Sequence, residues 1–464
     1  MPRGCRIIDF PRFMDERGGL SFAESQGHIP FHIERVFWLY GLTGCRSRGG
    51  HSHGHCAQVV IAVHGAFDLM LDDGEVRTTI HLDSPHRGVL IAPTVWDELK
   101  NFAEGTVVMV MASHHFDAED YISDYEEFRD KLVELKPYDS TCAQEWDDFV
   151  DRAKNGTFLY KRGYMDYHAD RFTDCSLMFY KRGELIGQLP ASWDKNRHTV
   201  TSHGGLTYGG ILLSESATTI ETLNMMSCAA SWFAQCLGAM EWIYKPIPYI
   251  YNSVPNEEDL YALFRMDTRL AGRSVASVIS RDRQVPMRTL RKRSIAKSRK
   301  SHLTYEECNE WSTFWPLLKT VLKSRHNATP VHTLEEIELL ASRFPDNIRL
   351  FVARHEGAII AGAVVYETGM VAHTQYLAVS DEGIHHHALD GLIAYLAEER
   401  YASKPYLDLG TSMEPTTSML NEGLIFQKEG FGARAVVYDA YSVPLGKSEF
   451  LEASEFSKKN KKTS

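Results

Sequence analysis

The chain has 464 residues, the length of about three domains of ordinary size. Hydrophobic residues make up 44% and charged residues 24% of it, which is typical of a folded protein with a substantial core. The net charge of −11 argues against broad binding of nucleic acid. No apolar run approaches the ~20 residues of a membrane span, and the eight cysteines lack paired spacing. We therefore expect a cytoplasmic protein with reduced thiols and no membrane or nucleic-acid partner.

The N-terminal part contains short runs of β-branched and aromatic residues that alternate with turn signals. These runs are residues 36–40, 59–63, 66–71, 88–92 and 107–112. Such runs predict strands, and no helical pattern separates them. The pattern favours a β-barrel of the cupin or jelly-roll type, whose mouth encloses a small ligand.

An arginine and alternating histidines stand just before one of these strands, at Arg48, His51, His53 and His55. Side chains alternate along an extended chain, so His51 and His53 should face the same side. Imidazoles beside a guanidinium suit proton transfer on an anionic substrate, because histidine titrates near neutral pH. A metal site and a solvated strand end are the alternative interpretations of a His-x-His pair.

Metal binding is the weaker of the two chemical interpretations. A metal-binding cupin has a glutamate shortly after its His-x-His and a histidine on a later strand. This chain has Gln58 at the first position and Trp-Asp-Glu, residues 96–98, on the later strand. A neutral amide is a poorer ligand for a divalent ion than a carboxylate. We expect acid–base catalysis without a metal.

Five segments within residues 1–129 resemble the sugar-nucleotide 3,4-ketoisomerases, cupins that act on dTDP-4-keto-6-deoxyhexoses. The segments are residues 15–20, 33–36, 48–53, 71–74 and 120–128. An ordered set of this kind is more specific than any single motif. The chain departs from the family pattern at Ser52 and Gly54, where alanine and lysine are usual. Phe37 and Trp38 replace tyrosines, which leaves Tyr40 as the phenol of that strand.

The resemblance implies that a ketone moves from C4 to C3 of a sugar ring through an enediol. One positioned base can serve both carbons, and such proton transfer accelerates a reaction by about 10²–10⁴-fold. We assign this base to His51 or His53 and the polarisation of the oxygens to the other histidine. The expected substrate-binding residues are Arg48 for the diphosphate, Arg17 and Glu24 for the thymidine end, and Gln58 and Tyr40. Related barrels form dimers, so we expect a homodimer through this domain.

Two hairpins of the same layout indicate an internal repeat in the rest of the chain. Residues 176–180 and 185–190 flank one charged turn, and residues 348–354 and 358–366 flank the other. The second hairpin is followed by a strand over 371–379, a helix over 388–396, a strand over 406–410 and a last strand through Tyr438. Residues 143–152 form a further predicted helix.

This order resembles the GNAT acyltransferase fold, and two copies flanking a basic helix over 288–300 resemble the Fem-type double-GNAT arrangement. The basic helix contacts phosphates or forms a solvated outer face. We expect a multidomain α+β chain: a β-barrel followed by tandem GNAT-like α/β domains. The expected parts are a ketoisomerase domain (1–135), a linker (136–154), two GNAT-like domains (155–285 and 286–445) and a polar tail (446–464).

The acyl donor and acceptor sites are less well marked. GNAT enzymes hold the CoA diphosphate with backbone amides before the central helix, where this chain has residues 382–388, a poor match to the family turn. Its three adjacent histidines splay by about 100° on a helix and do not converge on a metal. Glycine-rich segments at 163–172 and 203–210 allow close approach of a ligand. They supply the acceptor-site candidates Asp166, His168, His203 and Tyr208.

The two resemblances combine into a bifunctional enzyme with dTDP-linked deoxysugars as partners. It would isomerise dTDP-4-keto-6-deoxyglucose and N-acylate a dTDP-3-amino-3,6-dideoxyhexose, with acetyl-CoA or another acyl-CoA as co-substrate. A separate aminotransferase would make the amine. One alternative is a Fem-like transferase that uses aminoacyl-tRNA and carries a non-catalytic sugar-nucleotide-binding cupin. Another is a cupin that senses sugar nucleotides and regulates the acyltransferase.

Overall fold

The computed structural model describes residues 1–2, 4–42, 46–74, 76–282, 284–414 and 419–445. They form two compact units. The first contains Met1–Lys136, Phe179–Glu184 and Leu445, and the second contains Pro137–Met178 and Leu185–Pro444. Within these ranges no helix is long and apolar enough to cross a membrane. The polar tail expected over 446–464 lies outside the described residues.

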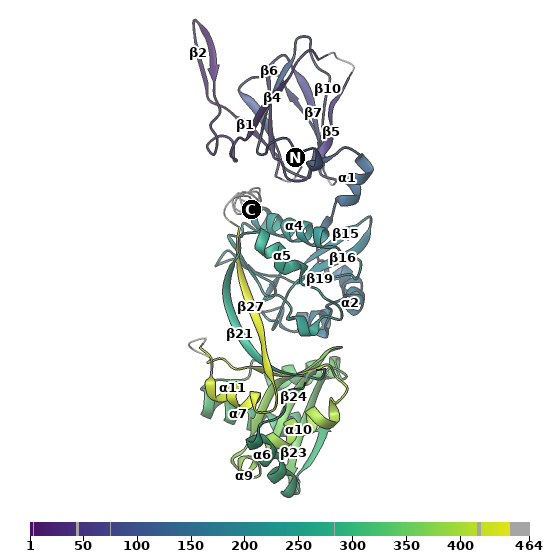
Figure 1. Cartoon of the computed structure of the whole chain (residues 1–464), viewed down its shortest axis with the longest axis vertical. Coiled ribbons are helices and arrows are strands. Elements are labelled where there is room, and N and C mark those ends of the chain that lie inside the picture. Colours follow the sequence, from purple (N-terminus) through teal and green to yellow (C-terminus); the bar gives the residue numbers. More distant parts are fainter. Residues whose placement is uncertain (3, 43–45, 75, 283, 415–418, 446–464) are drawn as a thin grey trace, which may run out of the picture. The chain divides into compact units, whose positions relative to one another are not determined.

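The first unit consists mainly of two antiparallel five-stranded sheets (Figure 1). One has the order β1-β9-β6-β11-β4 and the other the order β12-β5-β10-β7-β8. The strands are β1 (Arg6–Asp9), β4 (Arg35–Leu39), β5 (Arg48–His53), β6 (Gln58–His64), β7 (Phe67–Asp72), β8 (Arg77–Leu82), β9 (Arg87–Ile91), β10 (Trp96–Lys100), β11 (Val107–Ala112) and β12 (Tyr121–Ile122). The five runs predicted as strands are all confirmed, with ends that shift by a residue or two.

Apolar side chains fill the space between the two sheets. Val60 and Val110 of one sheet share a buried cluster with Leu71 and Leu99 of the other. Among the described residues each strand pairs only within its own sheet. These two packed sheets, a two-layered sandwich, fit the jelly-roll form of the expectation, and no closed barrel forms among the described residues. Run patterns predict strands but not whether the edge strands of two sheets join.

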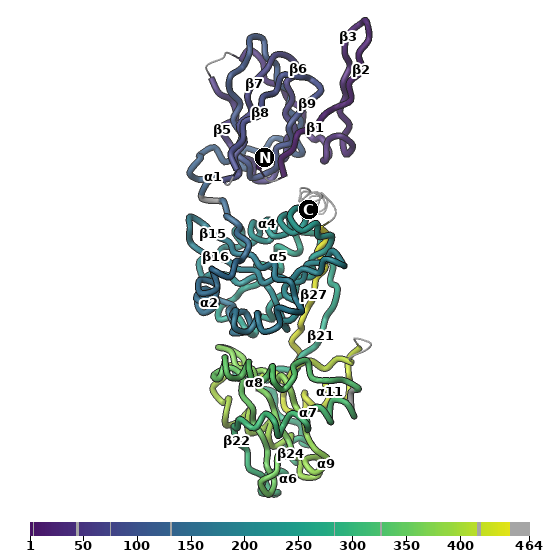
Figure 2. Tube along the Cα trace, turned by 180° about the vertical axis from the view of Figure 1, so that it is seen from behind, coloured from purple at the N-terminus to yellow at the C-terminus, as the bar shows by residue number. Residues whose placement is uncertain are grey.

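A separate hairpin of β2 (Arg12–Asp15) and β3 (Gly18–Ser21) projects from this sandwich (Figure 2). Every residue of both strands is exposed, including Phe13, Met14 and Leu20. After the sandwich the chain forms η1 (Ala118–Asp120), α1 (Tyr125–Lys131) and β13 (Glu134–Pro137).

The second unit is built on an eleven-stranded sheet with the order β14-β17-β18-β20-β27-β21-β26-β25-β24-β23-β22. Its strands are β14 (Thr173–Asp174), β17 (Ser192–Asp194), β18 (Thr199–Thr201), β20 (Glu241–Tyr244), β21 (Arg269–Ser280), β22 (Thr304–Cys308), β23 (Ile348–His355), β24 (Ala358–Glu367), β25 (Val371–Val379), β26 (Tyr406–Thr411) and β27 (Arg434–Pro444). Three more strands lie outside this sheet: β15 (Leu177–Lys181), β16 (Glu184–Leu189) and β19 (Leu212–Leu213).

Each half of the large sheet contains one parallel pair of strands joined by helix. In the first half α4 (Thr219–Leu237) connects β18 to β20, and in the second half α9 (Asp381–His385) and α10 (Ala388–Tyr395) connect β25 to β26. Parallel neighbours need such a crossover, so the two halves repeat one strand–helix–strand plan. The long strands β21 and β27 run between the halves (Figure 1).

The remaining helices cover this sheet or precede it. They are η2 (Ser140–Cys142), α2 (Ala143–Arg152), η3 (Phe158–Tyr160), α3 (Arg162–Met165), η4 (Asp166–His168), η5 (Tyr249–Tyr251), α5 (Glu258–Arg265), α6 (Thr289–Lys300), α7 (Trp311–His326), α8 (Leu334–Arg343), η6 (Leu396–Arg400) and α11 (Glu422–Glu429). The helix predicted over 143–152, both hairpins and the strand over 371–379 are confirmed. The last strand runs past Tyr438 to Pro444.

Candidate active sites

His51 and His53 lie side by side on the inner face of the N-terminal sandwich, with ring centroids 5.0 Å apart. Strand pairing puts His51 opposite Asp97, and Asp97 opposite the core residue Leu71, so their side chains share one face. The Nε2 of His51 is 3.9 Å from Oδ2 of Asp97. His51 is 20% exposed and His53 only 5%, so His51 is the more accessible ring.

Both ring nitrogens of His53 are bound. Nδ1 lies 2.9 Å from Oδ2 of Asp120, and Nε2 lies 2.9 Å from the side-chain nitrogen of Gln58. An ionised carboxylate only accepts hydrogen bonds, and an amide nitrogen only donates, so His53 carries its proton on Nδ1. Asp120 also accepts from the backbone N–H of His55 at 2.7 Å. The hydrogen bonds to Asp120 and Gln58 thus hold the His53 ring in one orientation.

The electrostatics of this cluster favour His51 as the base. Burial lowers the pKa of His51, and the neighbouring His53 lowers it further. Burial acts to raise the pKa of Asp120, yet hydrogen bonds from His53 and His55 leave it below its ordinary value. Burial and the nearby Glu98 raise the pKa of Asp97 to about 7. The site therefore offers an unprotonated imidazole, His51, beside one carboxyl group, Asp97, that can hold a proton near neutral pH.

Tyr121 is the phenol beside the histidines. Its ring centroid lies 4.9 Å from that of His51 and 4.3 Å from that of His53, because β12 pairs Tyr121 with His53. Tyr40, the tyrosine expected there, follows β4 in the other sheet and is 71% exposed. The structure does not bring Tyr40 to the histidines. The signal for Tyr121 was present in the sequence, within segment 120–128.

The other predicted substrate-binding residues divide into two groups. Gln58 contacts His53, and Arg48 opens the strand that carries the histidines. Arg17, by contrast, lies at the turn of the projecting hairpin, pairs with Asp15 and is 85% exposed. Glu24 follows that hairpin, is exposed, and has its Oε2 3.7 Å from Nδ1 of His28.

Two groups of described residues have the right ligand types and spacing for a metal ion. His53, Cys56 and Asp120 form one, and His355, Glu382 and His386 form the other, each with ligand atoms within 4.8 Å of one another. In the first group the atoms that would bind a metal already make hydrogen bonds: Nδ1 of His53 with Asp120, and Sγ of Cys56 with the Ala57 carbonyl. In the second, Nδ1 of His355 is 2.7 Å from Oε1 of Glu382. Of the three adjacent histidines at 385–387, only His386 belongs to this group. The expected splay on one helix does not describe them, because α9 ends at His385 and His387 precedes α10.

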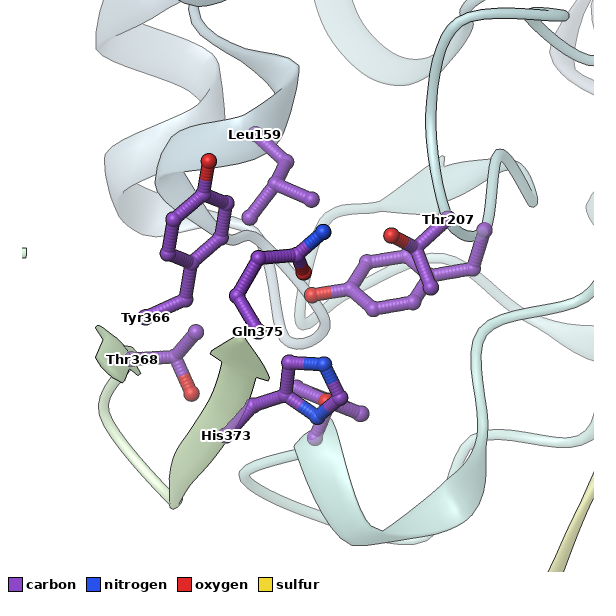
Figure 3. A pocket seen from close by; sticks show the side chains of 8 residues that line it. Leu159, Thr207, Tyr366, Thr368, His373 and Gln375 are labelled. Atoms are coloured by element: carbon purple, nitrogen blue, oxygen red, sulfur yellow. The ribbon is translucent and has the colours of Figure 1, made fainter. Parts of the chain in front are cut away.

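A small cavity in the second unit, of about 10 Å³, has room for one water molecule. Both halves of the unit supply its lining, and Figure 3 shows Gln375 between Tyr366 and Thr207 with His373 close by. The lining residues are Leu159, Thr207, Tyr208, Tyr251, Tyr366, Thr368, His373 and Gln375. Aromatic faces, hydroxyls, an amide and one imidazole make this a neutral polar site.

The imidazole of His373 is bound to a buried carboxylate. The parallel ladder of β25 and β26 sets His373 beside Asp408, with Nδ1 2.8 Å from Oδ2. Asp408 is fully buried and accepts further hydrogen bonds of 2.8 Å from the Tyr438 hydroxyl and the Gly410 N–H. Burial acts to raise the pKa of Asp408, but His373 and these hydrogen bonds leave it lowered, so it is ionised.

A second hydrogen-bonded link joins this carboxylate to the cavity. The hydroxyls of Tyr438 and Tyr251 lie 3.0 Å apart, and Tyr251 lines the cavity. Lys428 donates to the carbonyls of Gly410 and Thr411 at 2.9 and 2.8 Å. Burial lowers the pKa of Lys428 to about 8. Lys428 is a buried positive charge that interacts with Asp408 and balances its negative charge.

Of the four predicted acceptor-site residues, Tyr208 lines the cavity and the other three lie outside its lining. His168 and His203 are buried and stack with ring centroids 5.2 Å apart. Burial lowers the pKa of His203 to about 3, which suits a packed neutral ring. Asp166 has Oδ1 3.6 Å from Arg162. The sequence analysis missed His373 and Asp408, although both lie on strands that it predicted.

Comparisons with known families match both parts of the chain. Residues 3–133 match FdtA, described as WxcM-like, C-terminal, and residues 287–415 match Acetyltransf_6, an acetyltransferase (GNAT) domain. The fold and the sites thus define a WxcM-like sandwich joined to a GNAT-type acetyltransferase domain.

Individual relatives narrow the N-terminal class further. The TDP-4-oxo-6-deoxy-alpha-D-glucose-3,4-oxoisomerase of Aneurinibacillus thermoaerophilus is 36% identical over 130 residues, which cover 28% of this chain and 94% of that protein. A solved 3,4-ketoisomerase from Helicobacter canadensis is 34% identical over 27% of this chain and 95% of its own, with a TM-score of 0.27. Through its N-terminal domain, the chain belongs to the family of the TDP-sugar 3,4-ketoisomerases.

The C-terminal part resembles a further solved structure in fold. The solved structure of FemX is 13% identical to this chain and has a TM-score of 0.51. The match covers 69% of this chain and 100% of FemX. At this identity the likeness concerns the fold alone, and the C-terminal part is a Fem-like, acetyltransferase-type region.

Proposed function

We propose that the protein is bifunctional and acts twice on one class of dTDP-sugar. Its N-terminal domain converts dTDP-4-keto-6-deoxyglucose into the 3-keto isomer. Its C-terminal part acylates the 3-amino group of a dTDP-3-amino-3,6-dideoxyhexose with acyl-CoA. The observation that carries the first activity is the His51–His53 pair on the inner face of a domain 36% identical to a TDP-sugar oxoisomerase.

In the isomerisation, His51 removes the C3 proton and returns a proton to C4. Its lowered pKa, from burial and from His53, keeps it unprotonated for the first step. Asp120 and Gln58 hold His53 beside His51, and the Tyr121 phenol faces the two sugar oxygens and carries protons between them. Arg48 meets the diphosphate through its guanidinium. No metal takes part in this scheme.

A proton NMR time course with purified protein and dTDP-4-keto-6-deoxyglucose tests this activity. We expect loss of the C3 proton signal and new ring-proton signals for a 3-keto sugar, with deuterium entering at C4 when the reaction runs in D₂O. The same spectra distinguish gluco from galacto configuration at C4. Unchanged substrate after prolonged incubation would overturn the isomerase proposal.

The acyltransferase proposal rests on the GNAT domain and on chemical continuity. A 3-keto sugar becomes a 3-amino sugar by transamination, and a primary amine is the acceptor that an N-acyltransferase needs. The lining of the cavity carries no charged Lys, Arg, Asp or Glu side chain, which suits a deprotonated amine nitrogen. Incubation of a dTDP-3-amino-3,6-dideoxyhexose with acetyl-CoA should release CoA thiol and add one acetyl group to the sugar.

The Fem-like fold supports a second candidate for the donor, aminoacyl-tRNA. Parallel reactions with acetyl-CoA and with charged tRNA separate the two. Acyl transfer from tRNA without thiol release from any short acyl-CoA would replace our proposal with the Fem-type transferase.

We further propose a homodimer formed by the N-terminal domain, in the cytoplasm. The exposed apolar side chains of Phe13, Met14 and Leu20 on the hairpin, and of Trp38 on β4, support a covered surface. Light scattering after size-exclusion chromatography should give twice the chain mass. The Trp38→Glu variant should shift the protein towards the monomer, while Trp38→Phe, which keeps an apolar aromatic side chain at the same position, should not.

A further inference from the structure

We propose that His373 is the general base of the acyl transfer and that Asp408 positions it, with the acceptor nitrogen taking the water-sized space that His373 lines in Figure 3. This assignment rests on the proposed N-acyltransferase function. It places the chemistry at the parallel strands β25 and β26 rather than at the glycine-rich segments of the first half.

The hydrogen bonds fix the protonation of the ring. Asp408 accepts at Oδ2 from Nδ1 of His373, so the Nδ1 proton stays in this bond. Within the described part of the chain the His373 ring makes no other hydrogen bond, and Nε2 keeps its lone pair. A carboxylate on Nδ1 also stabilises the imidazolium that forms when Nε2 takes up a proton. His373 thus has the tautomer that a base requires.

The burial of Asp408 argues that the pair has more than a packing role. An ionised carboxylate costs several kcal/mol to bury unless partners satisfy it. Here four groups do so: His373, Tyr438, the Gly410 N–H and, by its charge, Lys428. The residues of β26 on either side, Leu407 and Leu409, are buried apolar side chains. An apolar residue would fit the same sheet without these partners.

The chemistry of the cavity agrees with an amine acceptor. A protonated amine cannot attack a thioester, so the site must remove a proton and should not itself hold a fixed positive charge. The lining contributes no Lys or Arg. The titratable groups that face His373 or its carboxylate are Asp408, Tyr208, Tyr251, Tyr366, Tyr438 and Lys428. Burial raises the pKa of each of the four tyrosines, so these phenols stay neutral near neutral pH.

The acyl transfer needs only the amine, the thioester and His373. The amine nitrogen attacks the thioester carbonyl, the C–N bond forms, and the nitrogen gives its proton to Nε2 of His373. The C–S bond breaks as the tetrahedral intermediate collapses. The CoA thiolate takes the proton from the His373 imidazolium and leaves as free thiol. The products are the amide and CoA, with His373 returned to its starting form.

The test compares His373→Gln and Asp408→Asn with the unaltered full-length protein, in a thiol-release assay with acetyl-CoA and a dTDP-3-aminosugar. We expect His373→Gln to lower kcat by about 10²–10⁴-fold with little change in KM for acetyl-CoA. Asp408→Asn should lower kcat less and change the acid limb of the pH profile. Imidazole in the buffer should restore part of the rate of His373→Ala. Circular dichroism and thermal unfolding check that each variant is folded.

His81→Gln is the matched control, because it also removes a histidine whose Nδ1 contacts a carboxylate, Asp68, at 2.7 Å. It lies in the N-terminal unit and should leave acyl transfer unchanged. If the folded His373→Gln variant keeps the rate and the pH profile of the unaltered protein, the base assignment alone is overturned. If the unaltered protein releases no thiol with any acyl-CoA, the proposed acyltransferase function falls, and the base assignment with it.

Discussion

The Nδ1 of His53 lies 2.9 Å from Oδ2 of Asp120, although 67 residues separate them along the chain. This carboxylate holds the His53 ring nearly perpendicular to that of His51, at an interplanar angle of 85°. The same atoms meet at 2.8 Å between His373 and Asp408 in the second unit. Two different folds in one chain thus use a carboxylate to decide which imidazole nitrogen carries the proton.

The His51→Asn variant should lose isomerase activity and keep acyl transfer. Asparagine fills similar space but cannot take up the C3 proton, so the rate should fall by about 10²–10⁴-fold. Proton NMR with dTDP-4-keto-6-deoxyglucose measures this. His55→Asn is the control, because His55 is exposed and contributes only its backbone N–H to Asp120. Equal losses in both variants would contradict the role of His51.

Asp120→Asn should slow the isomerisation without weakening substrate binding. The amide can donate to Nδ1 of His53, which would move the ring proton to Nε2 and against the Gln58 amide. We expect kcat to fall and KM to change little in steady-state measurements. A rise in KM at constant kcat would show that Asp120 serves substrate binding instead.

The acid limb of the isomerase pH profile should lie below 6.5. The pKa of His51 is lowered from 6.5, first by burial and then by His53, so its basic form persists as the pH falls past that value. Activity is lost only as the pH drops through the lowered pKa. In His53→Asn the repulsion from His53 is gone, and the limb, read from any residual activity, should move to higher pH. A limb above 6.5 in the unaltered protein would contradict this assignment.

Chelators should leave the isomerase unaffected. Nδ1 and Nε2 of His53 are both engaged by protein groups, and His51 is left to act as a base rather than a ligand. Dialysis against EDTA followed by the NMR assay checks this. Loss of activity that zinc or iron(II) restores would show that the histidine pair binds a metal.

Trp146→Ala should destabilise the second unit by about 3–5 kcal/mol. Trp146 on α2 is completely buried, and its indole N–H donates to the Tyr160 carbonyl at 2.7 Å. The Arg162 guanidinium carbon lies 4.1 Å from its ring centre. Residues 136–154, expected as a linker, would then have a structural role. Denaturant unfolding measures the change, with exposed Gln144→Ala on the same helix as the control.

Local patterns predicted most of the elements, but not the relationships between them. The strand at 371–379 and the helix at 143–152 were predictable because the pattern of apolar residues that defines each element lies within the element itself. The pairs His53–Asp120 and His373–Asp408 were not, since each depends on the pairing of distant strands. Choosing acceptor residues by glycine content led to His168 and His203, which are packed in the core.

The same limit explains what the sequence left open about the first unit and the one correction there, at Tyr40. The runs predicted five strands but could not tell that the edge strands of the two sheets remain unjoined. Tyr40 was expected because it is the phenol that remains in its strand where Phe37 and Trp38 replace the usual tyrosines. Tyr121 reaches the histidines because β12 pairs with β5, which no local pattern near either residue reveals.

The pairing of β27 with β20 has a consequence for synthesis of the chain. β20 ends at Tyr244 and its partner begins at Arg434, about 190 residues later. At a ribosomal rate of ~5–20 residues per second, β27 is synthesised about 10–40 s after β20. Until then one side of β20 is an unpaired strand edge, which favours association with other chains. The nascent protein should therefore need chaperone protection during this interval, whereas the N-terminal sandwich has already emerged with all its strands.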